Sequence, residues 1–357
     1  MVAEAEPDHI RLVCVGGDED SAPHHVRKWM ETQPLEGIEV TVQFDEDLAS
    51  ALEILKEGEA DLLAVSGSTW HLWKGAPDTM VAAALPRRDE NHILVADDRL
   101  NFLPHKTVIL SNHKLQRRQL RRYRSDFRIL KPSAFAEEEG YKAPPEGRVA
   151  LQSWMEDLRG TKIIGGYVTE KHIFDLEDMK HARMFNLTTD TKKDGHARFL
   201  PSPLQGLTLL ISRKGFPKSL AERIGDSESL TAWACEQVIL QQINPEILDR
   251  IGVVVRHRQI ASLLNQAEEE KDLLRSTSLL DSEGDVIDTA SMVEILIEIV
   301  GRTGERTLLL ERLIDKEDAV THARLLVVEW ENMLGAVTAE HAEDIRLGPA
   351  RPAFLDL

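Results

Sequence analysis

The chain has 357 residues, of which 42% are hydrophobic and 29% are charged, and its formal net charge is −18. This composition is ordinary for a globular protein that is long enough to form two or three domains. The acidic balance argues against nonspecific binding to nucleic-acid phosphates, and no apolar run approaches the ~18 residues that predict a membrane span. We therefore expect a monomer in the cytoplasm, with no nucleic acid and no membrane as partner.

The two cysteines, Cys14 and Cys235, each stand beside apolar residues. This setting predicts two buried free thiols rather than a disulfide framework. No spacing of His, Cys, Asp and Glu side chains suits a metal site, so none is expected. The adjacent pair His24 and His25 lies in the first expected helix, and we interpret both as surface residues.

Strands and helices alternate in the first half of the chain. The elements expected in chain order are a strand at 11–15, a helix at 22–32, a strand at 37–42, a helix at 48–55 ending at Gly58, a strand at 61–65, a strand at 106–110 and a helix at 114–123. Such alternation predicts an α/β architecture with a mostly parallel sheet.

The middle of the chain is less regular. Residues 131–147 are rich in Pro, Glu, Ala and Gly and are interpreted as a loop or hinge. A helix at 149–158 and a strand at 161–165 are expected next, and the apolar run 207–212 predicts a further strand.

The last third has a different pattern. The expected elements are a strand at 252–256, a hairpin formed by strands at 273–280 and from 286, a helix at 292–300 ending at Gly301, and a helix at 316–334 closed by Gly335. Ser291 and Glu294 match a capping box for the first of these helices. The pattern predicts a small α+β C-terminal domain.

Residues 59–97 carry the most informative pattern of the chain. An apolar run precedes the polar loop 66–71, a second run ends in Leu-Pro-Arg-Arg-Asp-Glu at 85–90, and a third run covers 93–96. This segment resembles the first-domain core of porphobilinogen deaminases (hydroxymethylbilane synthases), where a loop containing Lys-Asp precedes a strand ending Leu-Pro-Arg-Glu-Asp. Residues 115–119, 199–213, 234–252 and 274–287 are similar to further motifs of that family, in the same order.

The resemblance implies a fold of two periplasmic-binding-protein-like α/β lobes around a cleft, plus a small C-terminal domain. Lobe 1 would comprise residues 1–104 and 200–226, lobe 2 residues 105–199, and the C-terminal domain, with extended helices, residues 227–357. The implied activity is that of a transferase of tetrapyrrole (porphyrin, heme) biosynthesis, which condenses four porphobilinogens on a dipyrromethane cofactor held by a cysteine.

Two positions depart from the chemistry that the resemblance implies. Trp70 stands at the position of the catalytic Asp, and an indole can neither carry a negative charge nor accept a proton. Ile247 stands at the position of the cofactor cysteine, and it cannot form a thioether. No catalytic residue and no cofactor attachment residue are therefore identified, which favours a pseudoenzyme. A carboxylate from Asp78, Glu170 or Asp175 near the cleft would restore the potential for catalysis.

The substrate of the family carries acetate and propionate groups, which arginine recognises through paired hydrogen bonds. Arg117, Arg118 and Arg148 match basic positions of the family and are the candidate carboxylate-binding residues, for an anionic small molecule such as a pyrrole carboxylate. The surrounding run of arginines at 117–124 has two interpretations, a solvated helix face or an anion site.

Three functions remain open at this point. The first is a divergent but working hydroxymethylbilane synthase. The second is a non-catalytic descendant whose cleft binds an anionic small molecule or a tetrapyrrole, or which regulates a partner. The third is a solute-binding α/β protein that shares only the lobe architecture, and it predicts no third domain with a hairpin after Gly252.

Overall fold

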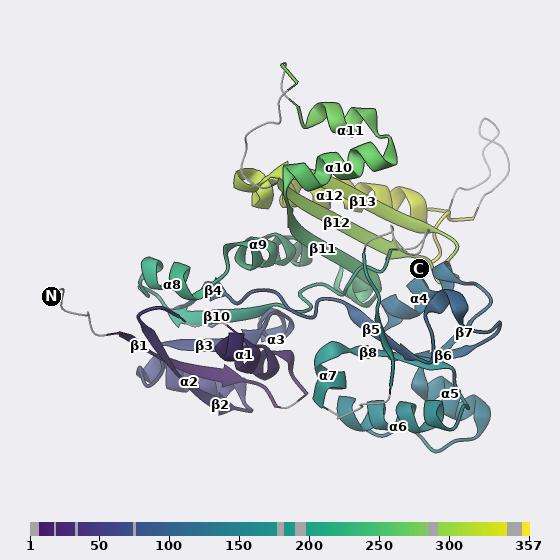
Figure 1. Ribbon diagram of the computed structural model, residues 1–357, viewed down its shortest axis with the longest axis horizontal. Coiled ribbons are helices and arrows are strands. Elements are labelled where there is room, and N and C mark those ends of the chain that lie inside the picture. Colours follow the sequence, from purple (N-terminus) through teal and green to yellow (C-terminus); the bar gives the residue numbers. More distant parts are fainter. Residues whose placement is uncertain are drawn as a thin grey trace.

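The computed structural model describes residues 7–17, 19–32, 35–73, 76–176, 182–189, 198–280, 283–284, 292–340 and 352–357. These residues form two lobes side by side, with a third domain lying across both of them (Figure 1). The two α/β lobes and the small C-terminal domain expected from the sequence are thus confirmed.

The first lobe contains a five-stranded sheet in the order β2-β1-β3-β10-β4. Its elements are β1 (Asp8–Val15), α1 (Ser21–Thr32), β2 (Ile38–Asp45), α2 (Leu48–Glu57), β3 (Leu62–Ser66), α3 (Gly67–Trp73), β4 (Thr79–Ala84), β10 (Thr208–Arg213) and α8 (Lys218–Ile224). β1 runs parallel to β2 and β3, whereas β10 runs antiparallel to β3 and β4. The expected parallel core is therefore present, with an antiparallel return strand.

Helix α2 shows how closely local sequence sets these elements. Leu48 and Leu55 are buried on one face, at the spacing that one side of a helix requires. Asp47 caps the N-terminus by accepting a hydrogen bond from the amide of Ser50. Gly58 ends the helix in the left-handed conformation, with φ of 82°.

The second lobe contains another five-stranded sheet, in the order β7-β6-β8-β5-β9. Its elements are β5 (His92–Ala96), η1 (Leu100–Phe102), β6 (Val108–Ser111), α4 (Lys114–Tyr123), β7 (Arg128–Leu130), α5 (Pro132–Glu139), α6 (Arg148–Gly160), β8 (Gly166–Glu170), α7 (Lys171–Leu176) and β9 (Met184–Asn186). β8 is the central strand, parallel to β6 and antiparallel to β5.

Three expectations for this lobe are corrected. The boundary at residue 104 assigned β5 to the first lobe, but β5 pairs with β8 and β9. The chain therefore crosses between the lobes at residues 85–91 and returns at 198–207. The expected loop at 131–147 contains α5, and the strand expected at 161–165 is β8, which starts only at Gly166.

The third domain is a three-stranded antiparallel sheet, β11-β12-β13, packed against helices. Its elements are α9 (Ser227–Gln242), η3 (Pro245–Arg250), β11 (Ile251–Arg258), α10 (Ile260–Glu270), α11 (Leu273–Ser278), β12 (Met292–Val300), β13 (Thr307–Asp315), η4 (Lys316–Asp318) and α12 (Ala319–Thr338). The expected helix at 316–334 corresponds to η4 and α12, which continues past Gly335.

Two expectations for the third domain are wrong. The segment expected as the helix 292–300 is strand β12, because its side chains alternate between two faces. Val293 and Ile295 enter the core beneath α9 and α12, while Glu298 on the opposite face contacts the second lobe. The strand expected at 273–280 is helix α11; its expected partner strand at 286–287 lies outside the described residues. The hairpin of this domain is β12–β13, so the third hypothesis fails its own criterion.

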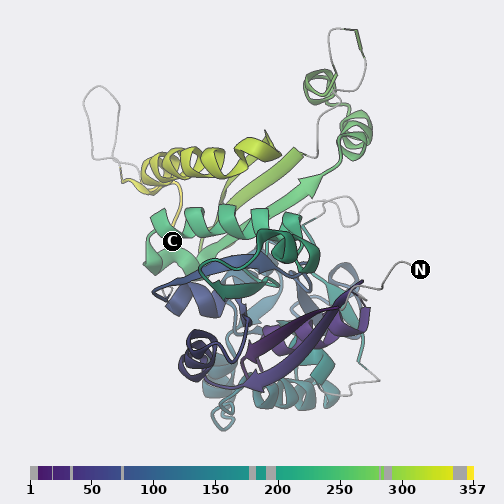
Figure 2. The same ribbon diagram turned by 90° about the vertical axis from the view of Figure 1, so that its left-hand side faces the viewer.

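The third domain holds both segments that cross between the lobes, and it lies above them in both views (Figures 1 and 2). Glu236 on α9 is fully buried; Arg87 donates to its Oε1 at 2.6 Å, and the amide of Leu204 donates to its Oε2 at 2.5 Å. The crossing segments also bond each other, since the amide of Arg88 donates to the carbonyl of Gly206. A Cβ at position 206 would lie 2.2 Å from the Arg88 carbonyl oxygen, so only glycine fits there.

Candidate functional site

A polar cavity of about 290 Å³ lies between the two lobes. The first lobe lines it from the ends of β1 and β3, and the second lobe lines it from the end of β8 and the start of α6. Ligands of open α/β sheets bind outside the carboxyl ends of the strands, which is where these residues lie. The cavity is therefore the natural candidate site.

Asp20 organises the wall formed by the first lobe. Its Oδ2 accepts hydrogen bonds from the hydroxyls of Ser66 and Thr69, both at 3.2 Å, and its Oδ1 accepts one from the amide of Ala22 at 2.9 Å. The last contact satisfies an amide at the N-terminus of α1. Because its partners are neutral hydroxyls and an amide, Asp20 brings a fixed negative charge to this wall.

His25 lies behind this wall and is 1% exposed. Its Nδ1 is 3.0 Å from the hydroxyl of Thr208 on β10. Burial, together with the nearby charges of His172 and His24, lowers the pKa of His25 to about 3. The ring is therefore neutral at physiological pH, and the expectation that His25 is a surface residue is wrong.

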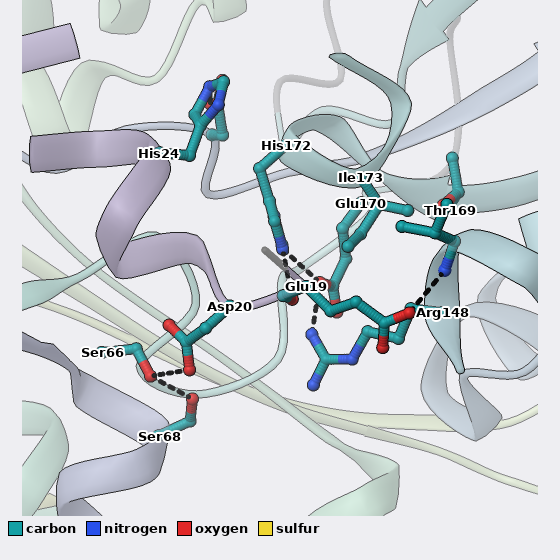
Figure 3. A network of polar contacts seen from close by, with 12 residues as sticks. Glu19, Asp20, His24, Ser66, Ser68, Arg148, Thr169, Glu170, His172 and Ile173 are labelled. Carbon is teal, nitrogen blue, oxygen red and sulfur yellow. Dashed lines mark hydrogen bonds and ion pairs between the residues drawn. The ribbon is translucent and has the colours of Figure 1, made fainter. Parts of the chain in front are cut away.

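Glu170 organises the opposite wall. Arg148 donates to its Oε2 at 2.9 Å, and His172 Nε2 lies 3.3 Å from the same oxygen (Figure 3). Burial opposes ionisation of Glu170, but the charges of Arg148, His113 and His172 outweigh it, so the pKa of Glu170 is lowered. The second lobe therefore presents a buried carboxylate whose charge is balanced by Arg148.

Glu19 joins the two walls. It belongs to the loop between β1 and α1, yet its Oε1 accepts a hydrogen bond from the amide of Val149 at the start of α6, at 3.1 Å. Its backbone carbonyl lies 3.2 Å from Nε2 of His172 (Figure 3). The N-cap residue of α6, Gly147, supplies no side chain, so a residue of the first lobe caps a helix of the second. The lobes are thus in contact across the cavity.

A larger cavity of about 600 Å³ adjoins the first, since Ser68 and His113 line both. Its lining includes the first turn of α4, with Lys114 and Arg117, and Lys131 at the start of α5. Lys114 is paired with Asp249 at 2.9 Å, whereas Arg117 donates only to the backbone carbonyls of residues 111 and 112. Among the described residues we find no ion pair for Arg117 or Lys131, so this cavity carries excess positive charge.

Of the three arginines expected to bind carboxylates, two reach these cavities. Arg117 lines the larger cavity and Arg148 the polar one. Arg118 does not: it is 4% exposed and donates at 2.7 Å to the carbonyl of Val300 on β12. The correction has a physical reason, because one helix turns consecutive residues by about 100° and so directs them to different neighbours.

The arginine run is neither a solvated helix face nor, as a whole, an anion site. Arg121 donates to the carbonyls of Arg302 and Ile129, and Arg122 pairs with buried Glu298 on β12. Arg124 binds Asp126 and two carbonyls near η1. Most of the run therefore attaches α4 to the third domain and to its own lobe.

The two positions that replace the family chemistry lie outside both cavities. Trp70 is 8% exposed and packs in the core of the first lobe, and Ile247 packs against the core of the third domain. Cys14 and Cys235 are buried free thiols, as expected, and burial raises the pKa of each to about 12. Neither cysteine can therefore supply a thiolate for a cofactor.

The acids considered from the sequence are placed apart from one another. Glu170 lines the polar cavity, as does Asp89, while Asp78 binds Lys214 on the surface and Asp175 binds Lys171. Asp20, the main carboxylate of the first wall, was missed by sequence reasoning. Its position after the end of β1, in a parallel sheet, was the available signal.

A cluster of possible metal ligands was also missed. His92, His113 and Glu170 each offer one ligand atom, and these atoms lie within 4.8 Å of one another. Burial lowers the pKa of both histidines, with their neighbours' positive charges adding to the effect. Their positions in the sequence form no recognisable spacing, so the expectation of no metal site rested on a pattern that could not detect them.

No protein-family model matches the chain, and no curated protein matches it. Among solved structures, an ABC transporter protein from Parabacteroides distasonis matches with a TM-score of 0.34 and 14% identity, covering 91% of this chain and 93% of its own. The aliphatic sulphonate binding protein SsuA from Escherichia coli matches with a TM-score of 0.32 and 12% identity, covering 92% and 94%. A sulfate-bound mutant of the OxyR2 regulatory domain from Vibrio vulnificus covers 63% and 98%, with a TM-score of 0.33 and 12% identity.

These likenesses are too distant to carry an argument about function, and the fold rests on the chain's own sheet order. They give no support to membership of the porphobilinogen deaminase family. Within the part of the chain that the structure describes, no helix combines the length and apolar character needed to cross a bilayer.

Proposed function

We propose that this chain is a non-catalytic cleft protein that binds a small anionic molecule between its lobes. The observation that carries the proposal is the pair of cations, Arg117 and Lys131, that line the 600 Å³ cavity without an ion pair among the described residues. The whole chain has a net charge of −18. A local excess of positive charge in a cleft of such a protein favours an anionic ligand there.

The helix that positions Arg117 adds to this field. α4 begins at Lys114, and its N-cap residue His113 makes no capping hydrogen bond with its side chain. The first amides of a helix lack partners within the helix, and the helix dipole makes its N-terminus positive. Asn112 to Leu115 line the cavity, so an anionic group would meet backbone donors and the Arg117 guanidinium at one end of the cleft.

The ligand class follows from the size and the charges of the cavity. A volume of about 600 Å³ is within the range that holds a small organic ligand. Two separated cations suit a molecule with two carboxylates, and the resemblance to porphobilinogen deaminases makes a pyrrole carboxylate such as porphobilinogen the first ligand to test. Trp70 and Ile247, together with the buried thiols, support binding without deaminase chemistry.

The test is calorimetric titration of the full chain with porphobilinogen and with succinate, a plain dicarboxylate. Charge-assisted hydrogen bonds contribute about 1.5–3 kcal/mol each, so Arg117→Gln combined with Lys131→Gln should weaken binding at least about 100-fold. Lys218→Gln is the matched control, because that lysine is exposed on α8 and pairs only with Glu222. Unchanged affinity in the double variant, with normal thermal unfolding, would refute the proposed site.

The competing function is a divergent deaminase, and one observation favours testing it: Asp20 and Glu170 place carboxylates in the polar cavity. General acid–base chemistry needs such groups. Purified protein incubated with porphobilinogen should release no uroporphyrinogen and carry no covalent dipyrromethane by mass spectrometry. Detection of either product would establish the deaminase instead.

A further inference from the structure

Three strand ends meet at one edge of the second sheet. β8 ends at Glu170, β5 begins at His92 and β6 is followed by His113. Glu170 and His92 are register partners in the antiparallel pair β5–β8, and β6 runs parallel to β8 on its other side. Sheet register therefore fixes these three residues next to one another on rigid elements.

The three side chains form a compact set of nitrogen and oxygen ligands. One ligand atom from each lies within 4.8 Å of the others. The rings of His92 and His113 have their centroids 4.2 Å apart at an angle of 60°, and His113 Nε2 is 3.9 Å from Glu170 Oε1. Ligands bound to one cation at about 2.0–2.2 Å are separated from each other by about 3–4 Å, which is close to this arrangement.

His92 is the least explained polar group of the cluster. It is 1% exposed, and neither of its ring nitrogens has a hydrogen-bond partner. A buried polar group without a partner costs about 1–3 kcal/mol, and such groups in native structures call for an explanation. A bound cation would accept one of these nitrogens as a ligand.

The carboxylate of Glu170 is already oriented. Arg148 and His172 both contact its Oε2, as Figure 3 shows, which leaves Oε1 directed toward His113. Residues that contact metal ligands typically fix them in this way. Arg148 also balances the charge of Glu170, so the site can persist without a cation.

We propose that His92, His113 and Glu170 bind a divalent first-row transition cation, with zinc as the first candidate. Two imidazoles and one carboxylate are a ligand set that such cations accept, and calcium and magnesium prefer oxygen alone. His113 and Glu170 line the polar cavity, so the open coordination positions of the cation would face the cleft. This inference goes beyond the proposed function and does not depend on Arg117 or Lys131.

The experiment titrates zinc, and separately cobalt, into the metal-free full chain. We expect one zinc per chain, and for cobalt a visible ligand-field absorption that reports nitrogen and oxygen ligands. His92→Leu should weaken zinc binding at least 100-fold and abolish the cobalt spectrum. His322→Gln is the matched control, since this histidine is exposed on α12 far along the chain from the cluster, and it should bind zinc as the parent does.

Thermal unfolding provides a second readout that separates metal binding from folding. Without metal, His92→Leu should unfold at the same temperature as the parent or higher, because it removes an unpaired buried imidazole. With zinc in excess, only the parent and His322→Gln should gain stability. Equal zinc affinity in all three proteins, or no zinc bound by the parent, would overturn the site, while the anion titrations remain independent of this result.

Discussion

Glu236 offers a direct test of how the third domain holds the lobes. Its carboxylate is fully buried and receives hydrogen bonds from Arg87 and from the amide of Leu204, one from each crossing segment. Burial raises the pKa of Glu236, while the Arg87 charge opposes the shift. Glu236→Ala would leave the guanidinium of Arg87, whose side chain is 11% exposed, without its carboxylate partner.

Removing one member of a buried ion pair costs about 3–5 kcal/mol, because the other charge stays buried and uncompensated. We expect that loss in the free energy of unfolding, measured by urea denaturation of the full chain. Arg87→Met combined with Glu236→Leu should recover most of it, since an apolar pair of similar volume avoids the desolvation cost. Glu329→Ala is the control: it breaks an exposed pair with Arg312 and should cost less than about 1 kcal/mol.

A loss of less than about 1 kcal/mol for Glu236→Ala would refute this reasoning, because it would mean that water or another group replaces the carboxylate. A large loss that the double substitution fails to recover would show that the geometry of the hydrogen bonds matters, and not only the charge balance.

The remaining predictions concern the cleft and the core. Glu19→Ala removes the cap that the first lobe provides to α6; we expect a loss of about 1 kcal/mol and a larger radius of gyration by small-angle scattering, and an unchanged radius would argue against Glu19 as a contact that keeps the lobes closed. His25 is neutral when folded, with a pKa of about 3 against 6.5 unfolded, so its contribution to stability is complete above pH 6.5 and falls toward pH 3. His25→Gln should therefore reduce the slope of unfolding free energy in that window by about 1.4 kcal/mol per pH unit, and an equal slope in both proteins would contradict the assignment. Trp70→Asp places a charge in an apolar core; we expect a loss of at least about 3 kcal/mol and no deaminase activity even with Ile247→Cys, and turnover of porphobilinogen by that double variant would contradict the placement of Trp70.

The sequence predicts elements well where the pattern is local. Helix α4 spans 114–123 as expected, and α2 begins and ends at its caps, Asp47 and Gly58. β12 was misassigned as a helix because Ser291 and Glu294 match a capping box, although the alternation of buried residues along 293–299 has the period of a strand. The capping pattern is short, and pairing with β11 and β13 on both sides decided the outcome.

The candidate site was less predictable, for a reason of geometry. Asp20, His92, His113 and Glu170 follow or precede four different strands, and only the order of strands in two sheets brings them to one cleft. Arg118 was assigned to the cleft from its place in a motif, but the face of α4 that carries it is covered by β12, which lies far along the chain. Such contacts are not encoded in the spacing of neighbouring residues.

The attachment of α9 to both crossing segments has a mechanical consequence. In a two-lobed protein the angle between the lobes changes by rotation about the segments that connect them. Here that rotation would displace Glu236 and Ser229, which bond residues 87 and 204, and with them the helix that covers the β11–β12–β13 sheet. The third domain is therefore geared to the lobes: occupancy of the cleft and the orientation of this domain form one coupled equilibrium, and a molecule that grips the domain from outside would change the affinity of the cleft by the same factor.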